Sequence, residues 1–207
     1  MRVVRIIVAV MVAAIITVTG CTTAPPDADQ PAPPPPAPNP THAPRPSTPQ
    51  TDPNDPVPVD RQAPIYTAVL RQYLTSGDHS FGDHRFSEVF VLDHTVAGAG
   101  GLGHRAPGAG PIPRGVQQAI THALTEVGSL TFVASPDAVI ENPHGCADVR
   151  GDGILVTLGP VDGSGDRVRV GINGFRACLG ANSLTYLVER TGRGWAVSGI
   201  TAHGPVA

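Results

Sequence analysis

The stretch GILVTLGPVDGSGDRVRVGI, residues 153–172, decides the fold, because apolar residues alternate with other residues on both sides of a central turn. An alternation with a period of two predicts a β-strand with one buried face. The turn, Asp162–Asp166, combines aspartate, glycine and serine, which are residues that favour a hairpin. The stretch therefore predicts two antiparallel strands, whose buried positions are Ile154, Val156, Leu158, Val168, Val170 and Ile172.

The same alternation continues towards the end of the chain. A second turn, Thr191–Gly194, separates the last two predicted strands, so the four segments together predict an antiparallel meander. The connection at residues 173–182 contains Gly174 and Gly180, which suggest bulges or a sharply bent strand. The apolar positions of the last two strands are Leu184, Tyr186, Val188, Trp195 and Val197.

Two helices and two further strands are predicted before the meander. Helices that precede and cover such a sheet make an α+β fold. We therefore predict two N-terminal helices packed on a bent antiparallel sheet that ends in the four-strand meander. Residues 61–207 are expected to form this one globular domain. The predicted elements are a helix from Pro64 to Leu74 that Gly77 ends, a buried strand Glu88–Leu92, a helix Pro113–Glu126 and a strand Leu130–Ala134.

The first twenty-one residues have the order of an export signal. Two arginines precede an apolar run from Ile6 to Ile16, and Val18-Thr19-Gly20-Cys21 follows. This segment resembles a bacterial lipoprotein signal peptide, in which the cysteine receives a diacylglyceryl group. The alternative, a transmembrane helix, needs about 20 apolar residues, and this run is shorter. We therefore predict a signal peptide at residues 1–20, lipidation of Cys21, and a chain anchored by lipid to the extracytoplasmic face of the cell membrane.

Residues 21–60 are predicted to link this anchor to the domain. Proline dominates from Thr22 to Asp60, with a run at Pro33–Pro36, and the segment contains no aromatic residue. Such a segment cannot build a core and favours the polyproline II helix, which rises about 3.1 Å per residue. The composition therefore predicts a disordered, proline-rich spacer that holds the domain away from the membrane.

The three cysteines divide into one anchor and one pair. With Cys21 carrying lipid, Cys146 and Cys178 remain, and outside the cytoplasm the environment is oxidising. The pair lacks the Cys-x-x-Cys spacing of a redox-active site. A structural disulfide between Cys146 and Cys178 is therefore the prediction.

The charge and the composition exclude several functions. The formal net charge is −3, and all fourteen basic residues are arginine. No basic stripe with interleaved aromatic residues occurs, so nucleic acid is not an expected partner. Without lysine the chain cannot form a Schiff base, a Ser-x-x-Lys acylation site or a Walker A loop. A Gly-x-Ser-x-Gly nucleophile motif is also absent, and no cofactor is expected.

The strongest candidate for chemistry lies between the first predicted helix and the strand that follows it. Two pentads, Gly77-Asp78-His79-Ser80-Phe81 and Gly82-Asp83-His84-Arg85-Phe86, are adjacent, and Asp93-His94 comes shortly after. Imidazole and carboxylate groups are suitable zinc ligands in an exported protein. A polar loop, with the phenylalanines packed inward and the histidines in solvent, explains the same pattern. The candidate metal ligands are His79, His84, His94, Asp78, Asp83 and Asp93.

Residues Gly98–Gly103 match the dinucleotide-binding pattern Gly-x-Gly-x-x-Gly. No helix opens directly after them, because Pro107, Pro111 and Pro113 intervene, so no helix N-terminus lies under a pyrophosphate. We therefore predict a mobile glycine-rich loop at this position instead of a cofactor site.

The whole arrangement is similar to actinobacterial envelope lipoproteins, in which a lipobox and a proline-rich spacer precede one domain. The resemblance includes the segments Val89–Asp93, Gly153–Pro160 and Gly171–Gly180. Such proteins are largely of uncharacterised function, so the resemblance implies location and fold and no activity. The order of helices and strands also resembles the cystatin and NTF2-like α+β folds, in which a long helix packs into a curved sheet.

The leading functional prediction is a non-catalytic binding or interaction module of the cell envelope. Its expected partners are the membrane, through the lipid anchor, and an envelope protein, a glycan or a lipid. The alternative is a metal-binding protein or metal-dependent hydrolase that uses the Asp-His cluster at residues 78–94. A structural protein that stabilises the cell wall is a third hypothesis.

Overall fold

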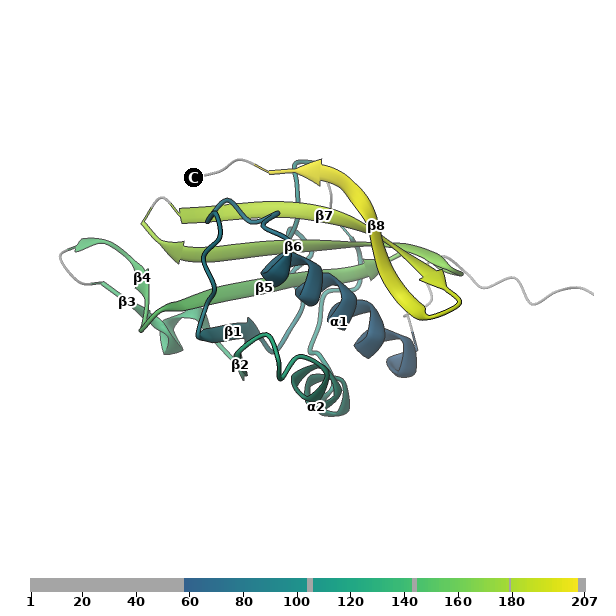
Figure 1. The fold of residues 1–207 in the computed structure, drawn as a ribbon, viewed down its shortest axis with the longest axis horizontal. Helices are drawn as coiled ribbons and strands as arrows, with labels where there is room; N and C mark the ends of the chain where they lie inside the picture. Colours follow the sequence, from purple (N-terminus) through teal and green to yellow (C-terminus); the bar gives the residue numbers. More distant parts are fainter. Residues whose placement is uncertain (1–57, 104–105, 143–144, 179, 205–207) are drawn as a thin grey trace, which may run out of the picture. The chain divides into compact units, whose positions relative to one another are not determined.

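The computed structural model describes residues 58–103, 106–142, 145–178 and 180–204. The predicted signal peptide, Cys21 and nearly all of the spacer lie outside these residues. The described part of the chain is an α+β domain with two α-helices and a mixed sheet of eight strands (Figure 1).

Four long strands form the predicted meander, and this prediction is confirmed. Each strand pairs antiparallel with the next one along the chain. The buried positions alternate as expected, and Val170 and Ile172 of one strand stand opposite Tyr186 and Leu184 of the next. The four strands are β5 (Gly153–Asp162), β6 (Arg167–Ala177), β7 (Gly180–Thr191) and β8 (Gly194–His203).

The described part of residues 173–182 belongs to two paired strands, and it contains an irregularity of the kind predicted. The β6–β7 ladder continues through Gly174, which pairs with Asn182, and the register shifts between Phe175 and Ala177. A Cβ atom on Gly174 would lie 2.0 Å from the hydroxyl oxygen of Tyr73. Gly174 is therefore required for the close approach of a helix side chain to the sheet, and it does not mark the end of the strand.

The sheet is mixed, so the prediction of a wholly antiparallel sheet is wrong. Strand β1 (Glu88–Leu92) runs parallel to β5 on one side and to β2 (Ser129–Val133) on the other. Val89 and Val91 pack towards the helices, while Phe90 and Leu92 belong to a cluster on the opposite face. A strand that is buried on both faces is apolar along its whole length, as parallel strands commonly are.

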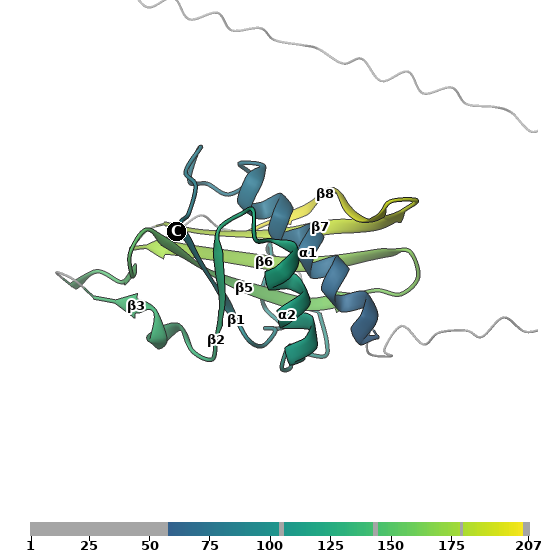
Figure 2. The same ribbon diagram turned by 60° about the horizontal axis from the view of Figure 1, so that its bottom comes forward.

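Both helices lie on one face of the sheet, as Figure 2 shows from a second side. Their apolar side chains contribute to the larger core cluster. Helix α1 (Val59–Thr75) begins five residues before Pro64, where the helix was predicted to start, so Val59 and Asp60 of the predicted spacer belong to it. Helix α2 (Arg114–Ala123) is three residues shorter at its end than predicted. The fully buried side chains of α1 are Ile65, Val69, Leu70 and Tyr73, and those of α2 with its cap are Val116, Ile120 and Leu124.

Short elements cover the opposite face of the sheet. They are the 3₁₀ turn η1 (Pro136–Ala138), β3 (Ile140–Glu141) and β4 (Asp148–Val149), and β4 pairs with β6 at Ala177. A disulfide joins Cys146 to Cys178 with a Cα–Cα distance of 5.4 Å, which is the pairing expected from the sequence. The bond links the β3–β4 region to the turn between β6 and β7.

The glycine-rich segment at residues 98–103 is packed on the sheet, which differs from the predicted mobile loop. The amide of Gly100 donates to Oδ1 of Asn173 at 2.8 Å, and the amide of Gly101 donates to Oγ1 of Thr185 at 3.0 Å. A Cβ atom on Gly171 would clash with the carbonyl group of Ala99. These glycines therefore permit a close approach between the loop and the two strands β6 and β7.

Candidate functional site

The first Asp-His pair lies where α1 ends and the loop to β1 begins. Gly77 adopts a positive φ of 74°, which ends the helix and turns the chain back over the sheet. Oδ2 of Asp78 accepts hydrogen bonds from Nε2 of Gln72 at 2.9 Å and from the hydroxyl of Tyr186 at 3.0 Å. Burial would raise the pKa of Asp78, but its hydrogen bonds to Gln72, Ser76 and Tyr186 outweigh this effect and lower the pKa. Asp78 therefore ties the loop to β7.

His79 is buried, with only 3% of its surface exposed. Its ring lies 5.6–5.7 Å from the rings of Tyr73, Phe81 and Phe86. Burial lowers the pKa of the imidazole, so His79 is neutral at neutral pH. Within the described residues its Nδ1 has no hydrogen-bond partner. His79 is therefore part of an aromatic cluster beneath the loop, which differs from the solvent exposure expected for a polar loop.

The second Asp-His pair separates in the structure. Asp83 is exposed, whereas Nε2 of His84 lies 3.0 Å from Oδ1 of Asp152, and the ring of His84 packs on Phe86. The same oxygen of Asp152 accepts a hydrogen bond from Arg176 at 2.9 Å. His84 thus contacts the turn before β5 and does not converge with the first pair on a common ligand.

The third pair is further away, at the other end of β1. Nδ1 of His94 lies 3.0 Å from Oδ1 of Asp93, the preceding residue, and His94 forms an isolated bridge with Pro111. The intervening strand has five residues and spans about 16 Å at the usual rise per residue. His94 and His84 therefore belong to different ends of the sheet.

The structure gives the metal hypothesis no support. In the described segments from residue 58 to residue 204, no three side chains of histidine, cysteine, aspartate or glutamate lie close enough together to hold a metal ion. Of the six candidate ligands, His79 lies in a buried aromatic cluster, Asp78 accepts hydrogen bonds from Gln72 and Tyr186, His84, Asp93 and His94 form ion pairs, and Asp83 is exposed.

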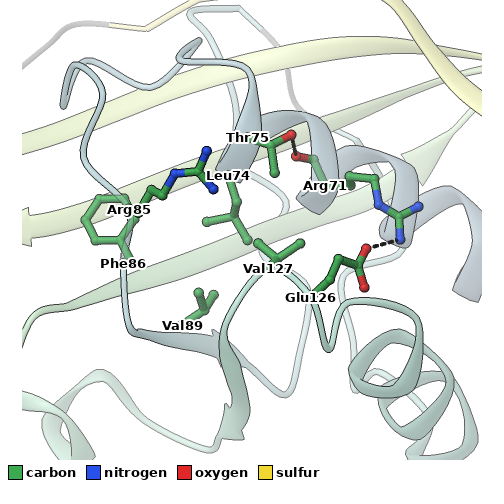
Figure 3. A pocket seen from close by; sticks show the side chains of 8 residues that line it. All are labelled: Arg71, Leu74, Thr75, Arg85, Phe86, Val89, Glu126 and Val127. Atoms are coloured by element: carbon green, nitrogen blue, oxygen red, sulfur yellow. Dashed lines mark hydrogen bonds and ion pairs between the residues drawn. The ribbon is translucent and has the colours of Figure 1, made fainter.

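A hollow of about 280 Å³ opens beside the loop, at the C-terminal end of α1 (Figure 3). Its rim carries Arg71, whose guanidinium lies 2.7 Å from Oε1 of Glu126 and also donates to the carbonyl of Ala123. We call this cavity the Arg85 hollow, since Arg85 stands on the side opposite to that ion pair. Its apolar walls are formed by Leu74, Phe86, Val89 and Val127.

A second hollow, of about 270 Å³, adjoins the first. Leu74, Thr75 and Arg85 line both cavities, so they form the shared wall. The second hollow is more polar, and His79 and Asp83 contribute to it. The loop that carries the Asp-His pairs therefore lines a composite site, with an apolar half and a polar half on the two sides of Arg85.

Arg85 is the distinctive group of this site. Among the residues that the structure describes, no hydrogen bond or ion pair involves its side chain, although it is exposed next to an apolar cavity. The neighbouring Arg71, by contrast, is engaged by Glu126. A free guanidinium can donate two parallel hydrogen bonds to a carboxylate or a phosphate. The composite site is thus suited to an anion that carries an apolar group.

The sequence pattern predicted metal ligands in this loop and did not indicate Arg85. The two pentads differ at one position, where Ser80 stands in the first and Arg85 in the second. Ser80 accepts a hydrogen bond from Asn182 of β7, so the first copy is fixed to the sheet. That difference within the repeat is the feature of the sequence that could have indicated Arg85.

Comparisons of the whole chain with protein-family models, with curated proteins and with solved structures find no match. The likeness to envelope lipoproteins and to the cystatin and NTF2-like folds therefore stays a prediction. Across the described residues, no helix is long and apolar enough to cross a membrane.

Proposed function

We propose that this chain is a lipid-anchored binding protein on the extracytoplasmic face of the cell membrane, and that it binds an amphipathic anion in the Arg85 hollow. The anchor rests on the lipobox ending at Cys21, and the proline-rich residues between Cys21 and helix α1 act as the disordered spacer. The observation that carries the binding function is one arginine without an ion pair among the described residues, which lines a cavity together with Leu74, Phe86, Val89 and Val127.

The chemistry of the hollow selects for both halves of such a ligand. The apolar part displaces water from Leu74, Phe86 and Val127, which stabilises the complex by about 25 cal/mol for each Å² buried. The anionic part accepts hydrogen bonds from Arg85, and a hydrogen bond to a charged group contributes about 1.5–3 kcal/mol. A neutral ligand lacks the second contribution, and a cation is repelled.

Three probes of equal chain length test this selectivity: octanoate, octanol and octylamine. Calorimetry measures their binding to the exported full chain carrying Cys21→Ser, which has no acyl chains of its own. We expect octanoate to bind about tenfold more tightly than octanol, since one charged hydrogen bond is worth about one order of magnitude. Octylamine is expected not to bind.

A pair of matched variants assigns the effect to Arg85. Arg85→Gln should reduce the affinity for octanoate to that for octanol and leave octanol unchanged. Arg114→Gln is the control, because Arg114 is also an exposed arginine and does not line the hollow. Equal binding of octanoate and octanol, or an equal loss in both variants, would contradict the proposal.

A further inference from the structure

A groove on another side of the domain runs between α2 and the edge strand β2. It has a volume of about 580 Å³ and shares no lining residue with the Arg85 hollow. Glutamine and threonine side chains and His122 line the α2 side, and Leu130, Thr131 and Phe132 line the β2 side. We call it the edge groove.

The main chain of β2 is open towards this groove. β2 ends the order of the sheet, so among the described strands only β1 pairs with it. The amide of Ser129 donates to the carbonyl of Ser87, and the carbonyl of Val133 accepts from the amide of Asp93. Since alternate residues of a strand point their main-chain groups to opposite sides, residues 129, 131 and 133 face β1. Leu130 and Phe132 therefore direct their N–H and C=O groups outward.

The lining of the edge groove is uncharged apart from the titratable ring of His122. No aspartate, glutamate, lysine or arginine of the described residues contributes to it. Leu130 and Phe132 are half-buried against the core, so they present apolar surface to an added strand. A charged segment would lose water here without gaining a partner, which costs free energy. The groove is therefore complementary to an uncharged, extended chain.

The proline-rich spacer of this same chain does not have the chemistry to occupy the groove. A strand that adds to an edge must donate N–H groups at alternate positions, and proline has none. Between Thr22 and Asp60 the longest stretch without proline has four residues, Asp27–Gln30, and two of them are aspartates. The spacer is therefore not the occupant.

We propose that the edge groove binds an extended, uncharged peptide segment of another envelope protein, which adds to the sheet as a strand beside β2. The peptide pairs with the main-chain groups of Leu130 and Phe132, which supplies affinity, and alternate side chains enter the groove towards α2, which supplies specificity. A second copy of this chain is the competing occupant, since its β2 is equally uncharged.

A phage-displayed library of random seven-residue peptides provides the probe. It is selected on the exported full chain with Cys21→Ser, and the enriched peptides are synthesised. We expect sequences without charge and without proline at the central positions. Replacing two adjacent central residues of an enriched peptide by proline should abolish binding, because the ladder loses its donors.

Two variants on α2 locate the binding site. Gln118→Arg places a charge in the edge groove and should weaken peptide binding at least about tenfold, in line with the cost of an uncompensated charge. Ala119→Arg is the matched control, because Ala119 is exposed on the same helix and does not line the groove. Arg85→Gln should leave peptide binding unchanged, which separates this proposal from the anion site.

Amide hydrogen exchange, measured residue by residue by NMR, tests the predicted contacts directly. Bound peptide should slow exchange at Leu130 and Phe132 and leave Thr131, which already bonds to β1, nearly unchanged. The proposal is overturned if no peptide is enriched, or if enriched peptides protect no amide of β2. It is also overturned if sedimentation shows a dimer of the chain that Gln118→Arg dissociates, since a second copy then occupies the groove.

Discussion

Removing the disulfide should destabilise the domain by an amount that follows from its position in the chain. The bond joins Cys146 to Cys178 across 32 residues. In the chain-entropy model a closed loop of that length lowers the entropy of the unfolded chain by about 12 cal/mol/K, which corresponds to about 3.7 kcal/mol at 25 °C. We expect the double variant Cys146→Ser/Cys178→Ser to lose this much free energy of unfolding.

Urea denaturation, followed by the fluorescence of Trp195, the single tryptophan of the chain, measures the change. Serine suits both sites, because Cys178 is exposed and Cys146 is half-buried. The dependence of the free energy on urea concentration should also steepen, since an unfolded chain without the cross-link exposes more surface. The parent protein in the presence of reductant should match the variant, and reductant should not affect the variant.

A loss of less than about 1 kcal/mol would refute this reasoning, because the entropy of the unfolded chain would then not be the main contribution of the bond. An unchanged dependence on urea would refute it independently.

Three further predictions concern the core, the loop and the pH dependence of stability. Gly174→Ala places a Cβ atom 2.0 Å from the hydroxyl oxygen of Tyr73 and should lower the free energy of unfolding by about 3 kcal/mol in urea denaturation. The double variant Gly174→Ala/Tyr73→Phe should regain part of this loss, because it lacks the hydroxyl oxygen. Thr185→Val removes the acceptor of the Gly101 amide and should lower the free energy of unfolding by about 2 kcal/mol, as expected for a buried donor without a partner. An unchanged free energy of unfolding would exclude that role. Because burial lowers the pKa of His79 in the folded state, the unfolded chain takes up that proton first, and stability should fall as the pH drops below about 6.5. Denaturation between pH 7 and pH 5 should show a smaller fall in His79→Leu, and an identical fall would exclude His79 as its source.

The meander could be predicted from the sequence because one face of each strand is buried. Val168 and Val170 alternate with the exposed Arg167 and Arg169, which is a local pattern. The parallel pairing of β1 was missed although the run Glu88–Leu92 carries the evidence for it. An uninterrupted apolar run requires cover on both faces, and that cover comes from α2 on one face and from the distant Val139, Ile140 and Val149 on the other.

The candidate site was predicted only in part. The loop with the two pentads was identified by its composition, but the roles of its residues depend on segments that are remote in sequence. Asp78 and Ser80 are held by Tyr186 and Asn182 of β7, and Arg85 faces a cavity because Glu126 and Val127 approach α1. The disulfide could be predicted without knowledge of such contacts, because Cys146 and Cys178 were the only pair left once Cys21 was assigned to the anchor.

The measurement that tests the central claim most directly is the intact mass of the protein purified from membranes of cells that express the full chain. The account predicts a chain that begins at Cys21 and carries a diacylglyceryl group, and predicts that Cys21→Ser abolishes both the modification and membrane association. A chain that retains residues 1–20, or an unmodified Cys21 in a protein that still sediments with membranes, would contradict the account.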